Sequence, residues 1–221
     1  MDTVVVFFEL GYIFNIIGMT ILVRNIQKKR HIEGISYYTQ LLFCISNFAK
    51  LIYFPHTVLW ELWVCWFEFL ATLVISALLM YYMVKYTSIS PNREKNVFDY
   101  RLIIVISLVL GLISNWEKDT DFEWAQFGIR FSIILEAIGL LPQIRLMRME
   151  KFVQKFMGFY LVAICLSRIC RVFFWVFQII DNSSGDTYYT LLLADSFYLC
   201  LTADFIYNFF KHRNTNVIPY N

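Results

Sequence analysis

The chain has 221 residues, of which 59% are hydrophobic and 19% aromatic, and its mean hydropathy is +0.57. This composition excludes an ordinary water-soluble domain, and a formal net charge of only +2 gives no reason to expect a nucleic-acid partner. Because a membrane-spanning helix needs about 20 mostly apolar residues, the chain has room for seven spans and short loops but for no separate soluble domain.

The apolar stretches predict an all-α integral membrane protein with seven spans. In chain order the spans cover residues 4–23, 35–54, 58–84, 102–116, 122–147, 152–179 and 187–210, and the fourth is the shortest. Residues 211–221 follow as a tail. The N-terminal stretch has no basic region and no small-residue cleavage site, so the first span is predicted to be a retained helix and not a signal peptide.

Basic residues alternate between consecutive connections. The first, third and fifth connections and the tail hold most of the 19 lysines and arginines, whereas the even connections hold only Lys118. Positively charged loops of membrane proteins stay in the cytosol. The pattern therefore predicts an N-terminus in the lumen or outside the cell and a C-terminus in the cytosol.

Charged residues also occur inside the predicted spans, where they are costly and usually mark function. The basic ones are Lys50, Arg130, Arg168 and Arg171, and the acidic ones are Glu68, Glu136, Asp195 and Asp204. Equal numbers predict pairing, because an unpaired buried charge is strongly destabilising. By depth, we expect Arg168 to pair with Glu136 or Asp204, whereas Arg130 has no evident partner except Glu68. Two interpretations stay open: interhelical ion pairs without a ligand, or a polar cavity whose charges rearrange on binding.

Two further patterns bear on a binding site. Arg168, Arg171 and Trp175 are spaced i, i+3 and i+7, so they share one helix face and predict a cationic, aromatic-edged pocket for an anionic ligand. Pro142 and Gln143 lie near the cytosolic end of the fifth span, where the proline removes a backbone hydrogen bond. This pair is either a hinge that lines a gate or simply the end of a helix.

Catalytic and metal-binding patterns do not stand out. The five cysteines all fall inside predicted spans, where we expect them to be small packing residues, and the three histidines lie in loops or at helix ends. We find no metal-ligand spacing, no nucleophile with a base and no phosphate-binding loop. The expectation is a protein that is not an enzyme and that needs no metal or cofactor.

Several segments resemble the ER lumen protein-retaining receptor family, the KDEL and HDEL receptors, over about residues 9–210. They are Gly34-Ile35-Ser36 with Gln40, Phe43 and Lys50; Leu135-Glu136-Ala137 with Leu141-Pro142-Gln143; Arg168 with Trp175; and Ala203-Asp204-Phe205 with Tyr207. The resemblance implies the fold of PQ-loop and SWEET transporters, in which a connecting helix joins two triple-helix bundles. It also implies a receptor in ER and cis-Golgi membranes that binds C-terminal tetrapeptide signals of ER proteins in acid and returns them in COPI vesicles.

The resemblance also implies roles for individual residues. Lys50 stands where the family has an arginine that grips the terminal carboxylate of the signal. Arg168 matches an arginine partnered by acids at the positions of Glu136 and Asp204, and Trp175 matches a tryptophan that lines the peptide site. Coat machinery would recognise the cytosolic loops and tail.

The chain departs from the family pattern in ways that leave its specificity open. The family's pH-sensing histidine aligns with Asn15, so any acid switch here is expected to act by protonation of Glu136 or Asp204, which would release Arg168. Other family arginines, acids and a tyrosine are replaced by Phe8, Gln178, Tyr53, Gln126 and Ser167, and Arg171 is an added cation. Loss of the acids predicts a changed preference for the leading basic residue of the signal. The alternatives are a small-solute transporter of the PQ-loop or SWEET type and a paralogue without signal binding.

Overall fold

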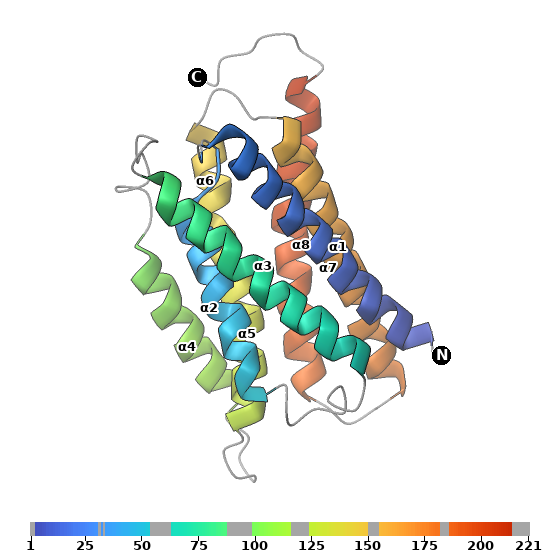
Figure 1. Ribbon diagram of the computed structural model, residues 1–221. Helices are drawn as coiled ribbons and strands as arrows, with labels where there is room; N and C mark the ends of the chain where they lie inside the picture. Colours follow the sequence, from blue (N-terminus) through green and yellow to red (C-terminus); the bar gives the residue numbers. More distant parts are fainter. Residues whose placement is uncertain are drawn as a thin grey trace.

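A computed structural model describes residues 3–30, 32, 34–53, 63–87, 99–115, 124–149, 155–181 and 186–213. Within these residues the chain is helical almost throughout (Figure 1). The helices are α1 (Thr3–Lys29), α2 (Tyr37–Tyr53), α3 (Trp63–Thr87), α4 (Tyr100–Ser114), α5 (Trp124–Gly139), α6 (Leu141–Met149), α7 (Lys155–Asp181) and α8 (Asp186–Arg213).

Several helix boundaries differ from those of the predicted spans, and α1 runs to Lys29 where the predicted first span ends at residue 23. The predicted span 122–147 is divided at Leu140 into α5 and α6, and the predicted tail 211–221 begins inside α8. Four segments are long and apolar enough to cross a membrane, and α4 is a shorter apolar helix. The four are Val5–Lys29, Trp66–Tyr86, Trp124–Leu146 and Gly158–Asp181. These features support the predicted class, an all-α membrane protein.

Local sequence explains where α1 ends and α4 begins. α1 continues beyond the apolar stretch because Lys28 and Lys29 in its last turn interact favourably with the negative end of the helix dipole. It stops where Arg30 adopts a left-handed conformation with φ of 53°. The side chain of Asp99 caps α4, since it accepts a hydrogen bond of 3.0 Å from the Arg101 amide.

The packing brings together helices that are distant in the sequence. α1 lies along α7 and α3, α2 lies along α5 and α3, and α8 lies against α5 and α7. α4 is an outer helix that packs mainly on α5 (Figure 1). The largest apolar cluster includes Leu22, Leu79, Leu140 and Ile164, which come from α1, α3, the α5–α6 junction and α7. The apolar core therefore lies between these helices, and it also surrounds the buried charges described below.

The outward faces of the helices are apolar as well. Large hydrophobic side chains such as Phe67, Val84, Ile113, Phe159 and Leu193 are more than half exposed. Exposed apolar area of this extent is unfavourable in water and suits contact with lipid chains. These helix faces therefore suit contact with a lipid bilayer.

Two glycines allow α1 and α7 to approach closely. A Cβ atom added at Gly11 would lie 3.2 Å from Cγ of Arg171 and 3.3 Å from the Ser167 carbonyl oxygen. A Cβ atom at Gly18, two turns further along α1, would lie 3.4 Å from Cβ of Ala163. Small residues at such positions are a common device for bringing membrane helices together. Gly11 also sets the distance between α1 and Arg171.

Replacing Gly18 with leucine is expected to destabilise the protein by roughly 1–3 kcal/mol, because the larger side chain has to push α7 away from α1. The midpoint of thermal unfolding in detergent measures the effect. Ile17→Leu is the matched control, because it introduces the same side chain at the neighbouring position. Ile17 is 45% exposed, so the new leucine does not press on α7. Equal midpoints for the two variants would contradict the close approach of α1 and α7.

Candidate functional site

The centre of the buried polar region is Glu136 on α5, which contacts three cations. Its Oε1 lies 2.5 Å from Nζ of Lys50 on α2. Its Oε2 lies 2.6 Å from Nη2 of Arg168 and 3.3 Å from Nη1 of Arg171, both on α7. Only 5% of Glu136 is exposed. These hydrogen bonds and ion pairs are therefore shielded from water, which strengthens them.

A second carboxylate, Asp195 on α8, completes the cluster. Its Oδ1 lies 2.6 Å from Nη1 of Arg168, and its Oδ2 lies 3.2 Å from Nε of Arg171. Oδ2 also accepts a hydrogen bond of 2.7 Å from the indole N–H of Trp175. Asp195 is fully buried. We call Lys50, Glu136, Arg168, Arg171 and Asp195 the charge network; it ties together α2, α5, α7 and α8.

The charge network has an excess of positive charge. Its three cations face two carboxylates, which leaves one net positive charge in a buried position. Arg171 is held least tightly, because its two ion pairs measure 3.3 and 3.2 Å whereas both ion pairs of Arg168 measure 2.6 Å. An excess buried charge is costly without a counter-ion. The arrangement is thus suited to hold one more anionic group.

Neighbouring side chains hold the cations in position. The guanidinium carbon of Arg168 lies 4.0 Å from the centroid of the Tyr198 ring, which is a cation–π contact. Nζ of Lys50 donates to Oδ1 of Asn47 at 3.2 Å, and Asn47 in turn donates to Ser76 of α3 at 2.7 Å. The network is thereby anchored to α3 as well as to the four helices that form it.

Comparison with known proteins identifies the family. The sequence profile described as ER lumen protein retaining receptor matches residues 31–178, which is more than half of the chain. The chain belongs to the ER lumen protein retaining receptor family. Together with the apolar helices, this membership makes it a multi-pass membrane protein.

Similar proteins carry the same family name in several organisms. The ER lumen protein-retaining receptor of Caenorhabditis briggsae is 29% identical over 195 residues, which cover 84% of this chain and 88% of that protein. The receptor of Drosophila melanogaster is 29% identical over 203 residues, covering 88% and 91% of the two chains. The receptor of Kluyveromyces lactis is 23% identical over 204 residues, covering 86% and 89%. The similarity to these receptors thus extends over most of the chain.

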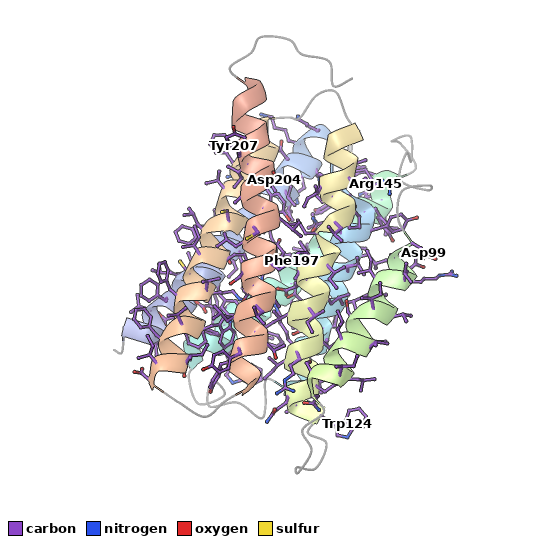
Figure 2. All side chains as sticks on the ribbon, turned by 180° about the vertical axis from the view of Figure 1, so that it is seen from behind. Asp99, Trp124, Arg145, Phe197, Asp204 and Tyr207 are labelled. Atoms are coloured by element: carbon purple, nitrogen blue, oxygen red, sulfur yellow. The ribbon has the colours of Figure 1, made fainter. Side chains whose placement is uncertain are left out.

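The structure brings together five of the site residues that the sequence singled out, and it corrects one. Arg168 pairs with Glu136 as expected, but its second carboxylate is Asp195 and not Asp204. Asp204 is exposed and lies nine residues further along α8, near the same end of the molecule as Arg145 (Figure 2). The sequence does contain a clue, because Ala194-Asp195 precedes Ala203-Asp204 as a second Ala-Asp pair.

Arg130 belongs to a separate polar contact, and its expected pairing with Glu68 is wrong. The guanidinium donates to the carbonyl oxygen of Ser114, the last residue of α4, and at 3.3 Å to Oε1 of Gln126. A cation at this position satisfies a free carbonyl and interacts favourably with the negative end of the helix dipole. Arg130, only 1% exposed, therefore fastens the end of α4 to α5.

Gln143 joins the α5–α6 junction to the start of α2. Its Oε1 accepts a hydrogen bond of 2.7 Å from the Ser36 amide, and its Nε2 donates to the Gly34 carbonyl at 2.9 Å. The backbone amide of Gln143, which follows Pro142, donates to the Thr39 hydroxyl at 3.0 Å. Because Gln143 is fully buried, water does not compete for these hydrogen bonds. In the described conformation the Pro142–Gln143 pair is thus a clasp between two helices.

Replacing Gln143 with leucine is expected to cost roughly 2–4 kcal/mol of stability, because the Ser36 amide and the Gly34 carbonyl lose their buried partners. Thermal unfolding of the purified protein measures the change. Arg145→Leu is the matched control, since Arg145 lies on the same helix but is exposed. A Gln143→Leu variant as stable as the Arg145→Leu variant would contradict the role of Gln143 as a clasp.

The charges of the site suit the binding of an anion. Among the described residues, no group of three or more His, Cys, Asp or Glu side chains is arranged to hold a metal ion. The charge network instead offers guanidinium and ammonium donors at low exposure, next to an indole ring. Such donors form short, strong hydrogen bonds with carboxylates.

Proposed function

We propose that this chain is a sorting receptor for C-terminal retention signals of the HDEL or KDEL type. It binds the signals of escaped ER-resident proteins in the Golgi, and COPI vesicles return the receptor with its cargo to the ER. The observation that carries the proposal is the net positive charge of the buried charge network, because such a signal ends in acidic side chains and a free carboxylate. The same charge argues against a neutral solute such as a sugar as the ligand. Membership in the retaining receptor family gives independent support.

In the proposed complex, Lys50, Arg168 and Arg171 bind the carboxylates of the signal. Arg171 turns to the ligand first, because its two ion pairs are the longest in the network. Trp175 borders the network and is proposed to contact the bound peptide, since its ring stacks on Tyr188 with centroids 6.2 Å apart and its N–H donates to Asp195. The added carboxylate cancels the excess positive charge.

For the membrane arrangement we propose two triple-helix bundles, with seven crossings in total. One bundle contains α1, α2 and α3, the other contains α5–α6, α7 and α8, and α4 connects them. The packing supports this proposal, because α3 contacts both α1 and α2, and α8 contacts both α5 and α7. The N-terminus faces the lumen of ER and cis-Golgi membranes and the C-terminus faces the cytosol, where loops and tail meet the coat. The Pro142–Gln143 clasp is the proposed hinge.

We also propose that acid favours binding, although Asn15 cannot titrate. This proposal rests on the family resemblance, and the pH dependence of peptide binding tests it.

Binding of a peptide that ends in His-Asp-Glu-Leu to the purified protein tests the proposal. We expect binding at mildly acidic pH, weaker binding at neutral pH, and a loss of at least about tenfold when the terminal carboxylate is amidated, since a buried charged hydrogen bond is removed. Equal binding of the amidated peptide, or no binding at either pH, would contradict the proposal. The alternatives would then be a small-solute transporter and a paralogue that does not bind the signal.

A further inference from the structure

The charge network carries one positive charge more than its own carboxylates balance. Its three cations pair with its two carboxylates at N–O distances of 2.5–3.3 Å, and these side chains are at most 12% exposed. A buried charge without a counter-charge is strongly unfavourable. The network therefore requires one further negative charge at all times, and not only while a signal peptide is bound.

Other acids on the membrane helices do not supply this charge. Glu9 on α1 and Glu68 on α3 form no ion pair within the part of the chain that the structure describes. Asp204 is exposed and lies nine residues beyond Asp195, which is about 13 Å along α8 (Figure 2). These side chains thus leave the excess charge of the network uncompensated.

Arg171 is fixed beside the two carboxylates and cannot carry its charge away from them. The backbone of α1 lies directly against its stem, since a Cβ atom added at Gly11 would lie 3.2 Å from Cγ of Arg171. The Ser167 hydroxyl donates to the Gly11 carbonyl at 2.6 Å, which holds α1 on α7 at this level. The guanidinium therefore stays in the network.

One edge of the Arg171 guanidinium is available to a further anion. Its Nη1 and Nε form the ion pairs of 3.3 and 3.2 Å, whereas no hydrogen bond or ion pair joins its Nη2 to the residues that the structure describes. Trp175, one turn further along α7, donates to the same Oδ2 atom of Asp195 that Nε of Arg171 contacts. The indole ring thus lies next to this guanidinium and limits the room to a small anion.

We propose that a small monovalent inorganic anion, with chloride as the representative, binds at the Nη2 edge of Arg171 when no peptide is present. Its single negative charge equals the excess of the network, so three cations then face three anionic groups. The anion site itself does not depend on the proposed function. Its consequence for the signal does: a carboxylate of the peptide displaces the anion, and the two compete.

Thermal unfolding without peptide tests the anion site, in sodium chloride and in sodium gluconate at equal ionic strength and pH. Gluconate is too large for the buried edge of Arg171. We expect a midpoint at least about 2 °C higher in chloride, as for an anion at about ten times its dissociation constant. Arg171→Gln loses this difference. Arg145→Gln is the matched control, because it removes an exposed arginine and keeps the difference.

Two further measurements on the unmodified protein keep the proposal testable should Arg171→Gln fail to fold. Affinity for a peptide that ends in His-Asp-Glu-Leu is expected to be about tenfold weaker in chloride than in gluconate, since the peptide has to displace the anion. In crystals grown with sodium bromide, the anomalous signal of bromide is expected at the guanidinium of Arg171.

Several outcomes would overturn the anion site and leave the proposed function standing: equal midpoints in the two salts, an unchanged difference in Arg171→Gln, or no bromide at Arg171. Equal midpoints together with a stability that rises with pH, except in Lys50→Gln, would show that Lys50 balances the network by releasing its proton. Chloride-dependent stability in a protein that binds no peptide would support the anion site and contradict the proposed function.

Discussion

Replacing Glu136 with glutamine is expected to lower the free energy of unfolding by roughly 3–5 kcal/mol, since removing one partner leaves buried charges without compensation. Glu136 is the only residue of the charge network that contacts Lys50, Arg168 and Arg171 together. After the substitution, three cations share the single carboxylate of Asp195. Thermal unfolding in detergent, with yield of the monodisperse protein as a second readout, measures the loss.

The appropriate control for Glu136→Gln is Asp204→Asn, which removes a carboxylate from the exposed face of α8. We expect this control to change the unfolding midpoint little. A second substitution, Lys50→Gln, in the Glu136→Gln background is expected to recover part of the lost stability, because it removes one of the uncompensated charges. Equal losses of stability in Glu136→Gln and Asp204→Asn would show that the network does not depend on charge balance. The same conclusion would follow if the double variant lost more stability than the two single substitutions lose together.

The charge network shows how far a sequence can predict a membrane site. Lys50, Glu136, Arg168 and Arg171 stand out because charges are rare in apolar spans, so their location alone marks them. The pairing is harder to predict, because it depends on how each helix is rotated and how deeply it sits. Asp195 and Asp204 illustrate the difficulty: both follow alanine on α8, and only the packing of α8 against α5 and α7 decides that Asp195 meets Arg168.

The helices themselves follow from the apolar pattern, and the errors occur where backbone groups find side-chain partners. The break at Leu140 is not visible as a gap in hydropathy, because Trp124–Leu146 is apolar as a whole. It is stabilised by Gln143, whose partners Gly34 and Ser36 lie more than 100 residues earlier. Arg130 is similar, since it donates to the backbone carbonyl of Ser114. Backbone partners of this kind leave no charge pattern in the sequence.

Replacing Arg171 with glutamine is expected to separate stability from binding. The substitution removes the excess charge of the network, so that Lys50 and Arg168 then balance Glu136 and Asp195. We therefore expect the variant without ligand to be at least as stable as the unmodified protein. Peptide affinity is expected to fall by about 10- to 100-fold, because the loss of a charged hydrogen bond to the ligand costs about 1.5–3 kcal/mol.

Two measurements on the same preparations decide this prediction: thermal unfolding without peptide and affinity for a peptide that ends in His-Asp-Glu-Leu. Arg145→Gln is the matched control, because it removes an exposed arginine of α6 and is expected to change neither value (Figure 2). A structural role for Arg171 would instead lower stability and affinity together, since its ion pairs with Glu136 and Asp195 would then be needed for the fold. Stability that is kept while affinity falls would show that the excess cation is present for the ligand, because a network that served only the fold would be balanced without Arg171.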